Sequence, residues 1–278
     1  MLGAIVGDIA GSLYEHNNIK YCIESDEMLS EHCRFTDDTV MTCAVADGIV
    51  KGLMQLPYYW LNTVNYEEIL CNEIVSSMQL FGKKYLNAGY GFNFLKWILS
   101  SNPKPYNSFG NGSAMRVSYV GWIARSLEEA EILAELSAKV THNHPDGIKG
   151  AIVVAGSIYK LLHNGSKEDI RKYAESFYNI DFSLDQIRTD YSFDVSCQGS
   201  VPQAIVAFLE GTSFSDVISK AISIGGDSDT IAAIAGSLAE TMYQIPTDLY
   251  QKAIYKLDDF LVCSIEASIK FRSEYLQR

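Results

Sequence analysis

Two segments of the sequence place a pair of aspartates among hydroxyl side chains at the start of an apolar stretch. In RFTDDTV the pair is Asp37 and Asp38, and in SIGGDSDTIAAIAGSLAE it is Asp227 and Asp229. One aspartate in such a position is typical of a helix N-terminus, where its carboxylate accepts hydrogen bonds from free backbone N–H groups. A second aspartate is not needed for capping. The two clusters are therefore either helix caps or ligand sets.

The ligand interpretation has a definite electrostatic consequence. If both clusters and Glu15 converge, five carboxylates share one pocket. At a separation of about 4 Å, each like-charge pair costs about 4 kcal/mol even at an effective dielectric constant near 20. Such a pocket must either take up protons or bind divalent cations. Oxygen ligands, including the hydroxyls of Thr36 and Thr230, select hard ions such as Mg²⁺ or Mn²⁺, and a pair of ions would neutralise the cluster.

The segment NSFGNGSAMRV has the composition of a ligand-binding loop. Gly110 and Gly112 allow a ligand to approach the backbone N–H groups closely, which suits phosphates. Phe109 could stack on a base or a sugar, and Arg116 could meet either a phosphate or an internal carboxylate. Because Gly-Asn-Gly also occurs in ordinary turns, the segment alone is a modest indication of a nucleotide-like ligand.

The segment THNHPDG contains His142 and His144. The two side chains could form a metal pair, but two histidines with no third ligand nearby make a weak zinc signal. A polar loop that enters a helix at Pro145 is the alternative, and it fits His144 at least as well.

The elements that would position these residues are helices. GAIVGDIAG repeats glycine at every fourth position from Gly3 to Gly11, so one helix face has no side chains and another backbone can approach it. Asp8, Ser12 and Glu15 share a second face, which is either solvated or lines a site. We interpret Glu15 as lying at the end of this helix and pointing into the site.

Further helices are indicated by apolar spacing and by their ends. Ser126 and Glu129 form a capping-box pattern, Pro145 suits a first turn, and Gly211 follows a last turn. Residues 173–193 are polar and aromatic, and we interpret them as a loop. No sustained alternation predicts a strand, and no linker or fixed repeat divides the chain. The prediction is an all-α fold with a single domain over residues 1–278.

Composition narrows the functional classes. The chain of 278 residues is 47% hydrophobic and 20% charged, which is typical of a globular protein with a sizeable core. A formal charge of −12 argues against nucleic-acid binding, which needs a basic surface. No stretch is long and apolar enough to span a bilayer, and the first residues do not resemble a signal peptide. The six cysteines are widely spaced, so we expect small buried thiols in a cytoplasmic protein.

In this order along the chain, GDIAGSLYE, FTDDT, GNGSAMR, THNHPDGIKGA and GGDSDTIAAIAG resemble motifs of the ADP-ribosylglycohydrolases of the dinitrogenase-reductase-activating type. The resemblance extends from residue 3 to about residue 240, and it implies an all-α domain with a binuclear Mg²⁺ or Mn²⁺ centre in a cleft. The implied metal ligands are Thr36, Asp37, Asp38, Asp227, Asp229 and Thr230. The implied ADP-ribose-binding residues are Ser108, Phe109, Gly110, Asn111 and Gly112, with His142 nearby. Glu15 matches an acidic residue placed near the metals in some members.

The reaction that the resemblance implies is hydrolysis at ribose C1″ of an ADP-ribosylated side chain or small molecule. Its transition state should have oxocarbenium character. Asp37, Asp38 or Glu15 would act as general base, and the sequence does not indicate which of these three carboxylates does so. Two other functions remain open: a metal-dependent phosphoesterase and a non-catalytic ADP-ribose-binding module. The acceptor and the oligomeric state are not encoded in these motifs, although we favour a monomer.

Overall fold

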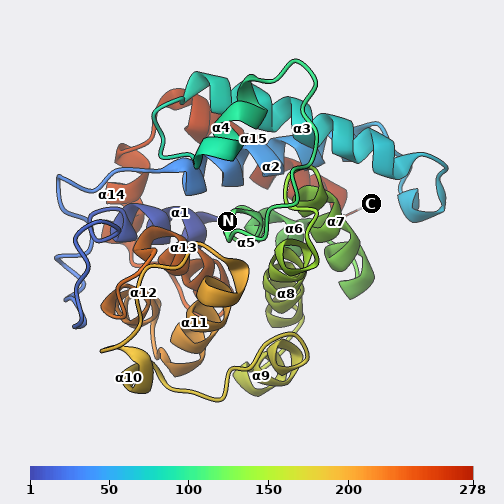
Figure 1. Ribbon diagram of the computed structural model, residues 1–278. Helices are drawn as coiled ribbons and strands as arrows, with labels where there is room; N and C mark the ends of the chain where they lie inside the picture. The colour runs from blue at the N-terminus through green and yellow to red at the C-terminus, as the bar shows by residue number, and fades with distance from the viewer. Residues whose placement is uncertain (278) are drawn as a thin grey trace.

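Two helices rich in small residues, α1 (Leu2–Gly11) and α13 (Ser228–Ala239), pack against each other in the interior of the computed structural model, which describes residues 1–277 (Figure 1). A Cβ atom added to Gly7 would lie 2.1 Å from the carbonyl oxygen of Ala232, and one added to Gly3 would lie 2.1 Å from that of Gly236. The backbones therefore touch, as the glycine spacing predicts. This contact brings the ends of α1 and α13 that carry acidic residues together.

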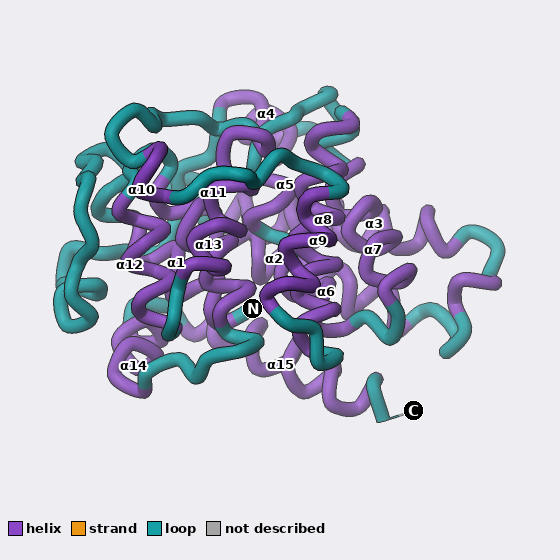
Figure 2. The backbone as a smooth tube through the Cα atoms, turned by 90° about the horizontal axis from the view of Figure 1, so that it is seen from below, coloured by secondary structure: helices purple, strands orange, loops and turns teal. Residues whose placement is uncertain are grey.

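The fold is all-α, as predicted, and residues 1–277 contain no β-strand (Figure 2). Besides α1 and α13, the helices are α2 (Asp37–Met54), the 3₁₀ helix η1 (Trp60–Asn62), α3 (Tyr66–Lys84), α4 (Phe92–Leu99), α5 (Gly112–Met115), α6 (Ser118–Ile123), α7 (Leu127–Lys139), α8 (Pro145–Leu162), α9 (Lys167–Glu175), α10 (Leu184–Ile187), α11 (Cys197–Glu210), α12 (Phe214–Ser223), α14 (Thr247–Tyr255) and α15 (Asp259–Tyr275).

The helices fall into three groups around α1 and α13. α2 packs against α3 and α15, α7 packs against α8, and α11 and α12 pack against α13 (Figure 1). α13 is buried over its whole length because its side chains are apolar or small on every face, and α2 is buried over most of its length except on the face that carries Asp47 and Lys51. The N-termini of these two buried helices carry the two acidic clusters. None of the helices within residues 1–277 combines the length and apolar character needed to cross a bilayer.

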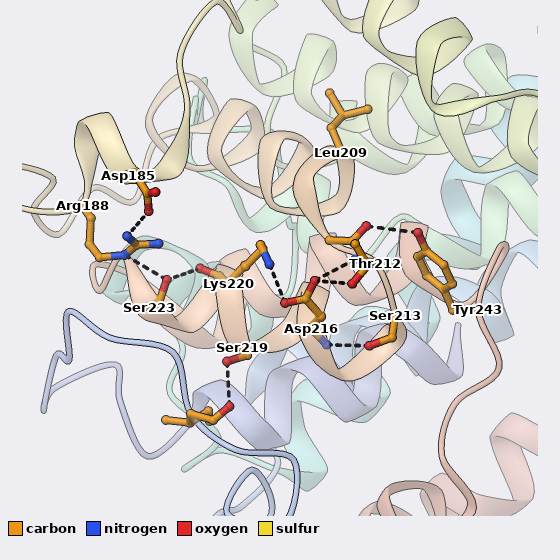
Figure 3. Close-up of polar contacts among 12 residues, drawn as sticks. Asp185, Arg188, Leu209, Thr212, Ser213, Asp216, Ser219, Lys220, Ser223 and Tyr243 are labelled. Carbon is orange, nitrogen blue, oxygen red and sulfur yellow. Dashed lines mark hydrogen bonds and ion pairs between the residues drawn. The ribbon is translucent and has the colours of Figure 1, made fainter.

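α12, which packs against α13, is held by polar contacts within the helix and to neighbouring segments (Figure 3). The Ser213 hydroxyl caps the helix by accepting from the N–H of Asp216, whose carboxylate also pairs with Lys220 one turn later. Ser219 donates to the carbonyl of Ile23, 2.8 Å away, and so ties α12 to the segment after α1. α13 thus packs against a helix that is itself tied to the segment after α1.

Several local predictions need correction. α1 ends at Gly11, so Glu15 lies in the turn that follows the helix and not in its last turn. Residues 173–193 are not wholly a loop, because they include the end of α9 and the short helix α10. Cys22 and Cys263 are exposed, so the expectation of uniformly buried thiols is wrong for these two.

Two helix-end predictions are confirmed and one holds only in part. Pro145 is the first residue of α8, and Gly211 follows the last residue of α11. Ser126 accepts from the N–H of Glu129. The Glu129 carboxylate, however, accepts from the N–H of Arg125 and pairs with its guanidinium, and it does not accept from the N–H of Ser126. The charge of Arg125 thus displaces the reciprocal half of the capping box.

Candidate functional site

A cleft of about 490 Å³ opens where the N-termini of α2 and α13 meet. Its acidic wall is formed by Glu15, Asp37, Asp38, Asp227 and Asp229, together with Thr230. The two clusters are almost two hundred residues apart in the sequence, and the contact between α1 and α13 brings them together.

Asp8 connects α1 to the first turn of α2. Its carboxylate accepts four hydrogen bonds, from the N–H and hydroxyl groups of Thr36 and Thr39, and it is fully buried. The Thr36 hydroxyl is the N-cap of α2, since it accepts from the N–H of Asp38 at 3.2 Å while it donates to Asp8 at 2.6 Å. Asp8 therefore fixes the turn that carries Asp37 and Asp38.

One group of carboxylate oxygens comes from three helices. Asp8, Asp38 and Asp229 each contribute an oxygen, and these oxygens lie within 4.8 Å of one another. Asp38 Oδ2 accepts from the Thr230 hydroxyl at 3.2 Å, whereas Asp38 Oδ1 is buried without any hydrogen-bond partner among the described residues. A buried carboxylate oxygen without a partner is costly unless something positive lies beside it.

A second group consists of oxygens of Glu15, Asp227 and Asp229, again within 4.8 Å of one another. Asp227 is at the N-cap position of α13, yet its side chain makes no capping hydrogen bond. Instead, Asp227 Oδ2 accepts from Asn111 Nδ2 at 2.6 Å. The geometry therefore does not support the capping interpretation of Asp227.

Burial and mutual repulsion raise the pKa values of the acidic wall. Burial, followed by the charge of Asp8, raises the pKa of Asp37 to about 8. The pKa values of Asp38 and Asp229 are raised well above the ordinary range, first by burial and then by neighbouring carboxylates. Burial also raises the pKa of Glu15. Six carboxylates, counting Asp8, cannot all be ionised here without compensating positive charge.

The residues present fit a hard divalent cation. Every candidate donor is an oxygen, the two carboxylate groups share Asp229, and Asp38, which belongs to the first group, has a buried oxygen without a partner among the described residues. Thr230 lies on the wall of the cleft, while Thr36 is behind it and is engaged by Asp8. The acidic wall could thus hold cations at two neighbouring positions.

The glycine loop faces the acidic wall. Ser108, Gly110, Asn111 and Gly112 line the cleft, and the N–H of Asn111 donates to the carbonyl of Val195 at 2.7 Å. Ser108 Oγ accepts from the N–H of Gly110 at 3.2 Å. The loop is therefore held on both sides, by its own serine and by the segment that precedes α11.

The aromatic side chain predicted to stack on a base or a sugar lies outside the lining of the cleft, and a different aromatic residue lines it. Phe109 is half exposed and lies edge-on to His144, with 5.5 Å between ring centroids, outside the lining of the cleft. Phe193 does line the cleft. His144 caps α8 by accepting from the N–H of Asp146, as the helix-entry interpretation predicts, whereas His142 is buried with its ring at the glycine loop.

Residues 89–94, with the sequence GYGFNF, also line the cleft, and the sequence analysis missed them. The N–H of Asp37 donates to the carbonyl of Ala88 at 2.9 Å, and Gly89 has φ +117° with its Cα facing the Asp37 carboxylate. In the sequence, the two glycines next to aromatic residues were the available indication that this segment lines a site. Nothing in their spacing relates this segment to the start of α2.

Comparison with known proteins agrees with this arrangement. The ADP-ribosylglycohydrolase family model matches residues 1–267. ADP-ribosylhydrolase ARH3 of Homo sapiens is 26% identical, over 95% of this chain and 91% of that protein. ADP-ribosylarginine hydrolase Tri1 of Pseudomonas putida is 24% identical, over 88% of this chain and 70% of that protein.

A solved structure supports the same fold. The structure titled "ADP-ribosylglycohydrolase-related protein complex" superposes with a TM-score of 0.62 at 18% identity and covers 99% of this chain and 95% of that one. With a family match that extends from the first helix into α15, and two acidic clusters joined at one cleft, the chain belongs to the ADP-ribosylglycohydrolase family.

Proposed function

We propose that this protein is a metal-dependent hydrolase that cleaves the C1″ linkage of an ADP-ribosylated side chain or small molecule and releases ADP-ribose. The observation that carries the proposal is the pair of carboxylate groups that share Asp229 at the wall of a cleft that the glycine loop also lines. The family, and the relatives named as ADP-ribosylhydrolases, support the same reaction. The whole chain would act as one domain.

Two Mg²⁺ or Mn²⁺ ions are the proposed cofactors. Their proposed ligands are Asp37, Asp38, Asp227, Asp229 and Thr230, which line the cleft, together with Thr36, which lies outside the lining and whose hydroxyl already donates to Asp8. When bound, such ions neutralise the clustered carboxylates, orient sugar hydroxyls and lower the pKa of a bound water. The donor set matches these ions because it contains only oxygens, and the unsatisfied Asp38 Oδ1 is a position where positive charge is needed.

The loop residues would bind the substrate. Gly110 and Gly112 line the cleft, and their missing side chains let Ser108 Oγ and His142 Nε2 lie close to the loop backbone, where a diphosphate would bind. Asn111 would act differently from its neighbours, because its amide already donates to Asp227 and to Ser200. We therefore assign Asn111 to holding the loop against the acidic wall.

Glu15 is the general base that we favour among the three candidates. Asp38 is buried and engaged by Thr230, and Asp37 is tied by its backbone to Ala88. The Glu15 side chain is 25% exposed and lies in a turn on the cleft wall. Because burial raises the pKa of Glu15, its carboxylate is a better proton acceptor than a solvated one.

The test is a panel of ADP-ribosylated substrates with defined linkages, incubated with Mg²⁺ or Mn²⁺ and analysed for product. We expect free ADP-ribose from at least one linkage and none in the presence of EDTA. Inorganic phosphate as the product would support a phosphoesterase instead. Tight ADP-ribose binding without any turnover would identify a binding module.

A further inference from the structure

Arg116 is a buried cation without an anionic partner. Its side chain is 1% exposed, and no Asp or Glu among residues 1–277 forms an ion pair with it. Its Nη2 donates to the carbonyl of Ser137 at 3.0 Å and to Thr141 Oγ1 at 2.9 Å. This pairing with an uncharged hydroxyl contradicts the internal carboxylate partner that the sequence left open, whereas Arg116 does line the cleft, as the phosphate alternative requires.

The hydrogen bonds around Thr141 determine the direction of its hydroxyl proton. A guanidinium has donors only, so Thr141 Oγ1 must accept from Arg116. The other polar neighbour of that hydroxyl among the described residues is His142 Nδ1, at 2.7 Å. If Nδ1 carried a proton, the Thr141 hydroxyl proton would have no acceptor in a buried environment, which is costly. The hydroxyl therefore donates to Nδ1, and Nδ1 has no proton.

The opposite ring nitrogen faces the glycine loop. A Cβ atom added to Gly112 would lie 3.2 Å from His142 Nε2, and one added to Gly110 would lie 3.5 Å from it. Nε2 makes no hydrogen bond within the described residues, and His142 lines the cleft. Burial and the charge of Arg116 both lower the pKa of His142, so the ring is neutral and carries its one proton on Nε2.

We propose that Arg116 and Thr141 are positioning residues that hold His142 as the Nε2–H tautomer, so that it donates a hydrogen bond to an oxygen of the ligand's diphosphate. The ligand class rests on the proposed function, but the tautomer does not. The opposite tautomer would present a lone pair to an anion and would repel it.

The first experiment is ¹⁵N NMR of the histidine rings in the ADP-ribose-free protein. The His142 signals are identified by their loss in His142→Gln. We expect the pattern of a neutral ring protonated at Nε2. In Thr141→Val, whose side chain has the same shape without the hydroxyl, the tautomer population should shift toward Nδ1–H. Thr141→Ser should restore the wild-type pattern. A wild-type ring protonated at Nδ1 overturns the proposal.

The second measurement is ADP-ribose affinity by calorimetry in Mg²⁺. Thr141→Val should weaken binding about tenfold, as expected for the loss of one hydrogen bond to a charged group. The matched control is Thr42→Val, another buried threonine, whose hydroxyl donates only to the carbonyl of Met115. Unchanged tautomer and affinity in Thr141→Val overturn the proposal. If wild-type protein fails to bind ADP-ribose, the proposed function fails, and the NMR result still decides the tautomer.

Discussion

At the scale of single residues, the sequence could not show which residues of the acidic clusters cap a helix and which are candidate metal ligands. Thr36 caps α2, so the sequence pattern typical of a helix start is real at that cluster. Asp227 occupies the equivalent position on α13 without capping it. The residue types identified the carboxylates as candidate ligands. The distance between the two clusters depends on helix packing, which residue types do not specify.

A substitution of Asp229 distinguishes a ligand from a structural aspartate. Asp229→Asn should keep the helical circular-dichroism spectrum and lose most ADP-ribose release, and Asp38→Asn should do the same, because a neutral amide is a poorer ligand for a hard cation. The metal-free variants should be slightly more stable, with one clustered anion fewer. Asp248→Asn, in the exposed first turn of α14, is the control. Near-wild-type turnover in Asp229→Asn would contradict the metal assignment.

Asp8 is a residue whose role follows from four hydrogen bonds that no sequence pattern reveals. Asp8→Asn keeps the shape but replaces one acceptor oxygen with a donor that faces the N–H and hydroxyl donors of Thr36 and Thr39. We expect a loss of about 2 kcal/mol in the free energy of unfolding and weaker Mg²⁺ binding. Urea unfolding and metal titration measure these effects. Unchanged values for both would show that Asp8 does not support α2.

At the scale of elements, α1 and α13 form the contact on which the site depends. The glycine repeat in α1 predicted a close backbone approach, and the structure confirms it at Gly3 and Gly7. The partner helix could not be predicted, because α13 is separated from α1 by most of the chain. Residues 89–94 were missed for a similar reason, since their position depends on how α3 and α4 fold back over α2.

Gly7→Ala tests this contact. Alanine favours an isolated helix by about 1 kcal/mol over glycine, yet its Cβ would collide with the carbonyl of Ala232. We expect a net loss of about 2 kcal/mol or more of stability, as in overpacked cores, together with weaker metal binding. Gly91→Ala is the control for stability alone, because Gly91 has nothing within 4 Å of its added Cβ and a φ of −60° but lines the cleft. A thermal melt of Gly7→Ala at or above the wild-type temperature would contradict the role assigned to this face.

At the scale of the whole molecule, the charge of −12 is partly concentrated at one buried wall. Composition predicted an acidic protein, but it gave no indication that six carboxylates meet. The free energy of folding must therefore depend on whatever balances their charge, whether protons or cations.

Thermal melting across pH tests this dependence. Burial raises the pKa of Asp37 to about 8, compared with an ordinary value of about 3.9. The folded state thus holds the proton more tightly than the unfolded state, and stability is lost as pH rises from about 4 to about 8. We expect the melting temperature in EDTA to fall from pH 6 to pH 8 and the gain from Mg²⁺ to grow. Melts that coincide with and without metal at pH 8 would remove the argument for cation binding.

The contact between α1 and α13 also orders events during synthesis. Residues 2–11 leave the ribosome more than two hundred residues before residues 228–239, which at about 5–20 residues per second is an interval of roughly 10–45 s. During that time the glycine face of α1 has no partner, and Asp8 and Glu15 have no Asp229 beside them. The proposed metal centre therefore cannot assemble on a nascent chain that lacks α13. Cation uptake would follow the synthesis of α13, and chains stalled before residue 228 would remain metal-free at this site.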